Sequence, residues 1–201
     1  MVDNKLLPIA EFFLNPVASY LNKKKISANV ITINGFVIGI LAVPFIISGF
    51  FKIAIILICL SRICDGLDGI IARLNAITNK GAFLDISLDF IFYASIPMAF
   101  AFHDPSENSL PALLLLFSFF GTGSTFLAFS IMAEREKITP KEFSKKGFYY
   151  LGGLVEGAET IMFLILMCLL PNYFTIIAYI FSFGCLITTI FRLKIGWSNL
   201  R

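Results

Sequence analysis

The chain has 201 residues and a mass of 22.4 kDa, about the length of one domain. Hydrophobic residues make up 58% of it and charged residues 14%, whereas a soluble domain is about half apolar and a quarter charged. These values exclude a soluble globular domain and a disordered chain, and a net charge of +3 is too small for a surface that binds nucleic acid. We expect one all-α integral membrane domain over residues 1–201.

Residues 1–22 predict an amphipathic helix that lies in the membrane interface. Its apolar residues recur at helical spacing, opposite polar ones: Leu6, Ile9, Phe13, Val17 and Tyr20. Pro16 is expected to break this helix, and a disordered tail is the alternative. A cleavable signal is excluded because Asp3 and Glu11 interrupt the apolar run.

Six stretches have the length of about 20 apolar residues that crosses a hydrocarbon core of about 30 Å. They are 29–47, 53–74, 81–102, 113–133, 154–170 and 173–192. Nearly all of the 16 Lys and Arg residues fall on one side of these spans, and the opposite loops, 103–111 and 171–172, contain none. The positive-inside rule therefore predicts that both termini are cytoplasmic. We expect His103 to be a solvated loop residue and the four cysteines to be buried in the apolar runs.

Four aspartates stand inside the second and third spans: Asp65, Asp68, Asp85 and Asp89. Each charge at mid-membrane costs about 2.5 to 3.5 kcal/mol if nothing compensates it. Spacings of three and four residues put each pair on one helix face, and a turn near residue 77 brings the two pairs to the same depth. Because carboxylates in one cavity repel each other, we expect two divalent ions there, Mg²⁺ or Mn²⁺, that bridge phosphates.

The residues around these aspartates favour a phosphate ligand. Gly66 and Gly69 leave room for a nucleotide to approach the backbone, and Arg73 can offer a charge-assisted fork to phosphate. Gly81 keeps the third span open on its acidic side. Taken singly, these glycines could equally permit close helix packing.

The string D-G-L-D-G-I-I-A-R from Asp65 to Arg73, followed by Gly81, Asp85 and Asp89, resembles the signature of the CDP-alcohol phosphatidyltransferase family. That signature reads D-x-x-D-G-x-x-A-R and, after a spacer, G-x-x-x-D-x-x-x-D, and every fixed position is met. The spacer is one residue shorter than usual, which affects the tilt of the hairpin more than the chemistry. The stretch from Ser27 to Thr32 is similar to the family's P-N-x-(I/L)-T entry, with Ala in place of the proline.

The resemblance implies transfer of a phosphatidyl or related group from a CDP-alcohol, such as CDP-diacylglycerol, to a hydroxyl acceptor, with release of CMP. It implies that Asp65, Asp68 and Asp85 hold the metal and that Asp89 is a further ligand or the general base. It also implies a set of CDP-binding residues: Gly66, Gly69, Ala72, Arg73, Gly81, Asn29 and Thr32. For Asn29, helix capping is the alternative. The family further implies six membrane helices, a cytoplasmic active site in the bacterial inner membrane, and often a homodimer.

The sequence leaves the acceptor open. Lys145 and Lys146, in the basic loop 134–153, either meet anionic headgroups or recognise an anionic acceptor. Glu156 and Glu159, in the fifth span, either bind acceptor hydroxyls or pair with an arginine, Arg62 or Arg73. The stretches 83–90 and 148–160 resemble a bacterial branch of the family whose acceptor is unassigned.

Two other classes of membrane protein use buried carboxylates. Membrane prenyltransferases bind Mg²⁺ and diphosphates, but their acidic motifs usually read N-D-x-x-D-x-x-x-D in longer chains. A cation transporter would leave the A-R dipeptide and the ordered glycines unexplained, and no internal repeat is evident. The transferase is therefore the leading hypothesis.

Overall fold

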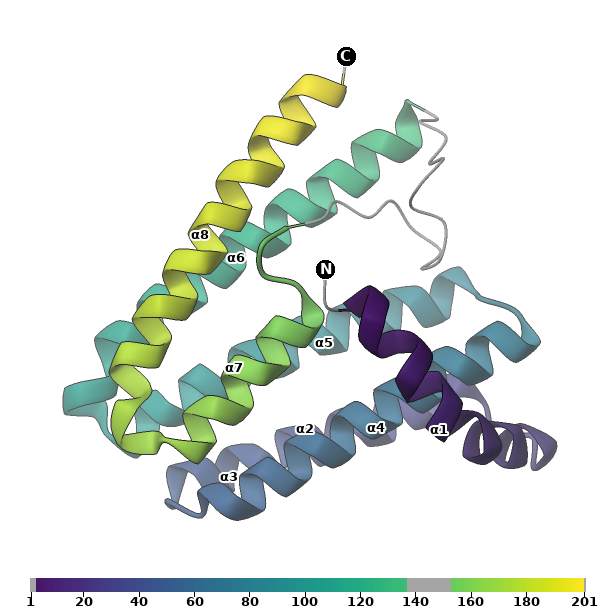
Figure 1. Ribbon diagram of the computed structural model, residues 1–201, viewed down its shortest axis with the longest axis horizontal. Helices are drawn as coiled ribbons and strands as arrows, with labels where there is room; N and C mark the ends of the chain where they lie inside the picture. The colour runs from purple at the N-terminus through teal and green to yellow at the C-terminus, as the bar shows by residue number, and fades with distance from the viewer. Residues whose placement is uncertain (1–2, 137–152, 201) are drawn as a thin grey trace.

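The computed structural model describes residues 3–136 and 153–200, which form helices and no strand. The elements in chain order are α1 (Asp3–Lys23), α2 (Ala28–Ile40), α3 (Ala42–Ile47), α4 (Phe51–Asn75), α5 (Asn79–His103), α6 (Pro105–Arg135), α7 (Gly157–Leu169), η1 (Pro171–Tyr173) and α8 (Phe174–Asn199). Figure 1 shows α6 and α8 side by side, with α1 lying across the end of α4. The expected all-α class is confirmed.

Four segments of the described chain are long and apolar enough to cross a membrane: 28–47, 79–103, 105–135 and 171–199. Their outer surfaces carry large apolar side chains, such as Phe120, which is 75% exposed, and these would face lipid tails. The other two expected spans differ in kind. α4 has 25 residues but includes the charged motif, and α7 has only 13 residues. The number of six spans therefore stays a prediction.

A local sequence signal moves the expected start of the fourth span. α6 begins at Pro105 rather than near residue 113, because the Asp104 carboxylate accepts the backbone N–H groups of Ser106 (3.1 Å) and Glu107 (3.2 Å), with proline in the first turn. The predicted loop 103–111 is thus wrong. Bonds from the Ser106 hydroxyl and the Glu107 N–H also lower the pKa of Asp104. His103 closes α5 with an exposed ring, and its Nδ1 lies 3.0 Å from the Ile47 carbonyl.

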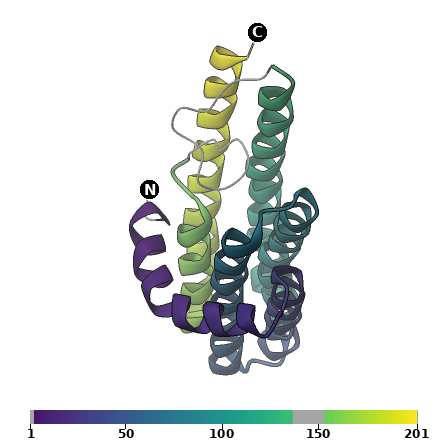
Figure 2. The ribbon, with the colours of Figure 1, turned by 90° about the vertical axis from the view of Figure 1, so that its right-hand side faces the viewer.

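Prolines act differently in the first two membrane-associated segments. The first span breaks at Leu41 into α2 and α3, because Pro44 lacks an N–H and its ring crowds the carbonyl of Ile40. α1, in contrast, is helical throughout 3–23, so the break expected near Pro16 is wrong. Figure 2 shows that α1 bends instead.

Two glycines bring α2 close to α4 and α5. A Cβ at Gly35 would lie 2.7 Å from the Cβ of Cys64, and one at Gly39 would lie 2.8 Å from the Phe92 ring and the Ser61 hydroxyl. Small residues four apart on a membrane helix permit this close approach of backbones. The spacing of Gly35 and Gly39 is a signal for this packing that the sequence itself carries. It places α2 against the acidic part of α4.

The main core fills the space between α3, α4, α5, α6, α7 and α8, where stacked aromatic pairs such as Phe100–Phe174 and Phe163–Phe181 each have ring centroids 4.4 Å apart. A second cluster fixes α1 on α4. It consists of buried or half-buried apolar residues: Leu14, Ala18, Leu21, Ile31, Leu67, Ile70 and Ile71. The opposite face of α1 leaves Phe12 and Phe13 exposed. These two faces make α1 a cover over the C-terminal part of α4.

The cysteines only partly meet expectation. Cys168 and Cys185 are buried and Cys64 is half-buried, but Cys59 is exposed, so its predicted burial is wrong. Cys59 lies on the outward face of α4 beside the exposed Leu60. An apolar run in a membrane helix therefore faces lipid as readily as protein.

Candidate active site

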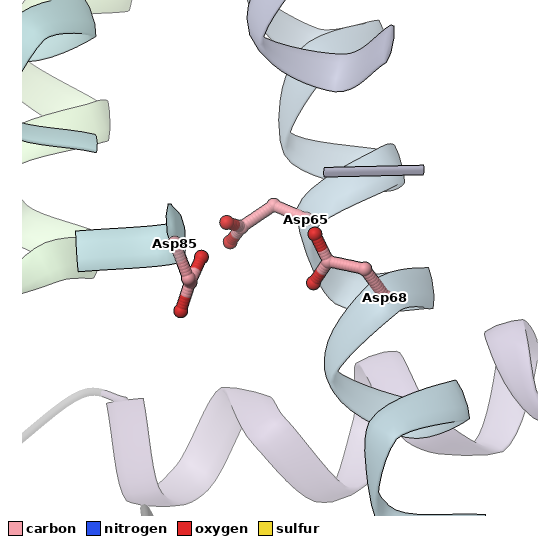
Figure 3. Close-up of side chains that lie close together, drawn as sticks. All are labelled: Asp65, Asp68 and Asp85. Carbon is pink, nitrogen blue, oxygen red and sulfur yellow. The ribbon is translucent and has the colours of Figure 1, made fainter. Parts of the chain in front are cut away.

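The α4–α5 hairpin brings three of the four aspartates together. α4 ends at Asn75 and α5 begins at Asn79, where the Thr78 hydroxyl caps the helix by accepting the Gly81 N–H at 3.1 Å. This confirms the turn expected near residue 77. One carboxylate oxygen from each of Asp65, Asp68 and Asp85 lies within 4.8 Å of the others, and Figure 3 shows Asp65 and Asp68 on one helix facing Asp85 on the next.

The three carboxylates fit a hard divalent cation. Asp68 is 6% exposed, and its Oδ2 has no hydrogen-bond partner among the described residues. A buried carboxylate oxygen without a partner is costly, and two more carboxylates beside it raise that cost by repulsion. A cation with all-oxygen ligands would give the buried oxygen a partner and would also offset the repulsion between the carboxylates. The chemistry of this donor set therefore suits Mg²⁺ or Mn²⁺.

The fourth aspartate, Asp89, lines a small cavity together with the other three aspartates but has different hydrogen-bond partners. Its Oδ1 accepts a hydrogen bond from Arg62 Nη1 at 2.8 Å, and its Oδ2 accepts one from the Tyr93 hydroxyl at 3.1 Å. Arg62 Nη1 is also 3.7 Å from Asp65 Oδ1. Neither Arg62 nor Tyr93 was predicted at this site from the sequence, although Tyr93 follows Asp89 by one helical turn.

A larger cavity of about 1030 Å³ joins this hairpin to α6, α7 and α8. It is lined by all four aspartates and by every residue predicted to bind CDP: Gly66, Gly69, Ala72, Arg73, Gly81, Asn29 and Thr32. Cavities that hold a ligand of drug size measure about 300 to 1,000 Å³, so this one is large enough for a nucleotide. The predicted donor residues thus share one space.

The motif glycines also serve packing. A Cβ on Gly66 would lie 2.7 Å from the end of the Leu14 side chain in α1, and one on Gly69 would lie 3.3 Å from Arg73 Nη1. Arg73 Nη2 in turn donates to Glu11 Oε1 of α1 at 2.9 Å. The absence of side chains at these positions lets α1 and the Arg73 guanidinium approach the acidic face of α4. Glu11 is a neighbour of the site that the sequence did not reveal.

The acceptor candidates fall in two places. Lys145 and Lys146 lie outside the described residues. Glu156 is the N-cap of α7 and forms a capping box with Glu159, whose Oε2 accepts the Glu156 N–H at 3.2 Å. α7, which corresponds to the expected fifth span, therefore starts at Gly157, three residues later than expected. Glu156 lines the large cavity. Arg62 and Arg73, their suggested partners, bond to other carboxylates.

Arg192 is a buried cation on the opposite side of the cavity. The last span was expected to end at residue 192, but α8 continues to Asn199 and Arg192 is only 8% exposed. Its Nη1 donates to the Thr122 carbonyl at 2.9 Å, and its guanidinium lies 5.6 Å from the centroid of the Phe126 ring. Arg192 thus places a positive charge on the wall of the cavity formed by α6 and α8.

Comparison with known proteins decides between the functional classes left open above. Residues 25–193 match the CDP-alcohol phosphatidyltransferase family. The chain belongs to this family. It is therefore a transferase of phospholipid biosynthesis that acts on a CDP-alcohol, rather than a prenyltransferase or a cation transporter.

Relatives agree with this membership. The inner membrane protein YnjF of Escherichia coli (strain K12) is 44% identical over 201 residues, which cover 100% of this chain and 98% of the relative. An uncharacterized protein of Aquifex aeolicus (strain VF5) is 28% identical over 197 residues, or 96% of this chain and 93% of the relative. With its apolar helices, this likeness makes the chain a bacterial inner membrane protein.

Solved structures share the fold. Phosphatidylinositol phosphate synthase (PgsA1) of Mycobacterium tuberculosis with CDP-DAG bound has a TM-score of 0.73 at 21% identity, covering 92% of this chain and 94% of that one. The same enzyme in complex with manganese and citrate has a TM-score of 0.72 at 21% identity, covering 92% and 89%. CDP-alcohol phosphatidyltransferases depend on a divalent metal, which agrees with the donor set on α4 and α5.

Proposed function

We propose that the chain transfers a phosphatidyl or related group from CDP-diacylglycerol, or a similar CDP-alcohol, to a hydroxyl acceptor and releases CMP. One observation carries the proposal: the facing carboxylates of Asp65, Asp68 and Asp85 border a cavity that every predicted CDP-binding residue also lines. The CDP-DAG bound by the PgsA1 enzyme of the same fold supports this donor.

Asp65, Asp68 and Asp85 would hold the divalent metal, Mg²⁺ or Mn²⁺. When bound, such an ion neutralises charge on the diphosphate and on the departing CMP. The protein's part is to fix three oxygens in advance, two from α4 and one from α5. This is the electrostatic preorganisation on which phosphoryl transfer mostly depends.

The donor nucleotide would lie along α4 between the acidic cluster and α1. Gly66 and Gly69 line the cavity there without side chains of their own, Ala72 adds a small side chain, and Arg73 would offer its fork to a phosphate oxygen. Across the hairpin, Gly81 lies close to Asn29, since a Cβ at Gly81 would be 3.1 Å from Asn29 Oδ1. Asn29 and Thr32 of α2 would close the nucleotide site from the side.

Asp89 would act as the general base. Its carboxylate takes the proton from the acceptor hydroxyl, the hydroxyl oxygen forms a bond to the phosphorus next to the lipid, and the bond from that phosphorus to the oxygen of CMP breaks. The base must lie within hydrogen-bond reach of the hydroxyl. Asp89 lines the same cavity as the metal-binding carboxylates, which supports this role.

The acceptor would enter from the side of α6, α7 and α8. Both glutamate side chains take part in the capping box, but only Glu156 also lines the cavity, which makes it the better placed of the two for binding hydroxyl groups. Lys145 and Lys146 remain predicted acceptor residues. The expected arrangement of six spans, an interfacial α1, cytoplasmic termini and a homodimer in the lipid bilayer belongs to the same proposal.

Release of CMP by the purified full-length protein tests this function. CDP-diacylglycerol is supplied with glycerol phosphate, inositol phosphate, serine or a phospholipid as acceptor, and both CMP and lipid product are measured. We expect CMP and a new phospholipid in equal amounts with one acceptor class, and no release after chelation of divalent metal. CMP release that is unchanged by chelation, or no release with any CDP-alcohol, would contradict the proposal.

A further inference from the structure

We propose that the guanidinium of Arg62 serves as a fixed cation beside Asp89, so that the acidic cluster takes one divalent ion instead of the two expected from the sequence. The inference rests on the proposed function, because it concerns how that site balances its charge. It assigns a positioning role to a residue outside the family signature.

Arg62 occupies the place where a second ion would bridge α4 and α5. Its Nη1 lies 2.8 Å from Asp89 Oδ1 and 3.7 Å from Asp65 Oδ1, so one nitrogen contacts a carboxylate from each helix. A metal ion bound between Asp89 and Asp65 would lie beside this guanidinium, and the two positive charges would repel each other. The guanidinium and the ion therefore compete for one position.

Several contacts hold the guanidinium there. Arg62 Nη2 donates to the Ser61 hydroxyl at 3.1 Å, and the guanidinium carbon lies 4.5 Å from the centroid of the Phe92 ring. The side chain is only 17% exposed. Because arginine keeps its charge at any working pH, this position stays positive throughout a reaction cycle.

The two ends of the cluster differ in what they leave open. Both oxygens of Asp89 are engaged, one by Arg62 and the other by the Tyr93 hydroxyl at 3.1 Å. At the other end, Asp68 has a buried Oδ2 without a hydrogen-bond partner among the described residues, and one of its carboxylate oxygens lies within 4.8 Å of oxygens of Asp65 and Asp85. The end formed by Asp65, Asp68 and Asp85 can therefore accept a divalent ion without rearrangement, whereas the end at Asp89 already holds the Arg62 cation.

Stability alone does not explain Arg62. Its Nε is buried and lacks a hydrogen-bond partner in the described part of the chain, and a charged side chain at this depth is costly by itself. The contacts of Arg62 with Asp65 and Asp89 offset that cost, so an arginine is tolerated here only because the two carboxylates are next to it. Arg62 therefore holds Asp89 in place on the cavity and supplies the positive charge that a second metal would otherwise bring.

Counting bound Mn²⁺ tests the inference without using activity. The purified full-length protein in detergent is titrated with Mn²⁺ with and without CMP, and free and bound ion are measured by electron paramagnetic resonance and by calorimetry. We expect one ion per chain in both conditions. Arg62→Lys should keep one ion, because the fixed charge remains, whereas Arg62→Met should bind two.

The controls separate this inference from the function on which it rests. Asp68→Asn should lose the ion, and Asp89→Asn should keep it. Two ions in the wild-type chain, a single ion in a correctly folded Arg62→Met variant, or loss of the ion in Asp89→Asn would overturn the role of Arg62 but leave the transferase intact. No bound Mn²⁺ together with no CMP release would overturn both. The wild-type count decides the question even if Arg62→Met fails to elute as folded protein.

Discussion

The cavity has two walls of different character. The wall formed by α4 and α5 carries four carboxylates and Arg62, held by contacts between neighbouring helices of one hairpin. The wall formed by α6, α7 and α8 is mostly apolar and carries Arg192 and Glu156, which are held by a backbone carbonyl and a helix cap. The first wall can be read from residue spacing, whereas the second depends on how distant segments pack. This difference explains why the donor site can be predicted from the sequence and the acceptor site cannot.

The largest effect should come from the acidic wall. Asp85→Asn removes a ligand oxygen charge from the cluster, and we expect CMP release to fall by about 10³-fold or more, with loss of Mn²⁺ binding. Single-turnover rates and metal titration measure the two effects. Glu107→Gln, which neutralises an exposed carboxylate in the first turn of α6, is the control and should keep wild-type rates. Near-normal turnover in Asp85→Asn would contradict the assignment of the chemistry to the acidic wall.

A somewhat smaller loss is expected at Asp89. Asp89→Asn should lower kcat by about 10² to 10⁴-fold, the contribution of a positioned general base, while metal binding and the KM for the CDP-alcohol change little. Steady-state kinetics at saturating metal provide the split. Tyr93→Phe, which removes one hydrogen bond to the same carboxylate, is the matched variant and should have a weaker effect on kcat. A raised donor KM with unchanged kcat would place Asp89 in binding instead.

Arg73, which lies between the acidic wall and α1, is predicted to bind the donor. Arg73→Ala should raise the KM for the CDP-alcohol by about 10- to 150-fold, since a hydrogen bond to a charged group contributes about 1.5 to 3 kcal/mol. The acceptor KM should stay the same. Glu11→Gln removes only the partner of Arg73, and because this ion pair is part-exposed it should change stability by less than about 1 kcal/mol. If Glu11→Gln impaired donor binding as strongly as Arg73→Ala, the ion pair itself would be the functional unit.

The smallest effect belongs to the second wall. Glu159→Ala removes one half of the capping box of α7 and should lower the free energy of unfolding by about 1 kcal/mol, with the KM for the acceptor unchanged. Thermal unfolding in detergent and acceptor titration measure these effects. Glu159→Gln keeps the capping geometry and should behave like the wild type. A raised acceptor KM in Glu159→Gln would show instead that the carboxylate charge binds the acceptor.

Helical periodicity was sufficient to predict the hairpin. The positions of Asp65, Asp68 and Asp85 relative to a turn near residue 77 follow from the rise of 1.5 Å per residue, and this is why three carboxylates from two helices meet. The pairing of Arg62 with Asp89 could not be derived in this way. It depends on the rotation of α4 against α5, which the packing of Phe92 and the close approach at Gly39 determine.

Helix ends were predicted less well because short-range hydrogen bonds decide them. Hydropathy placed the start of the fourth span near residue 113, but the Asp104 cap starts the helix at Pro105. The same applies to Glu156 and Glu159, whose spacing of three residues is a capping pattern as well as an acidic face. The burial of Arg192 had no local signal, since it arises from the pairing of α8 with Thr122 and Phe126 of α6.

The shortness of α7 has a consequence for how two substrates of opposite solubility meet. Thirteen residues rise about 20 Å, less than the hydrocarbon thickness of about 30 Å, so in the proposed arrangement of six spans the non-helical backbone just before Gly157 would lie at membrane depth. There the Val155 N–H donates to the Thr188 hydroxyl at 3.0 Å, and such irregular backbone tolerates the bilayer only inside protein or beside water. A hydrophilic acceptor would thus arrive through a hydrated vestibule, while the acyl tails of the donor stay in the bilayer, and a single chamber would join the two phases.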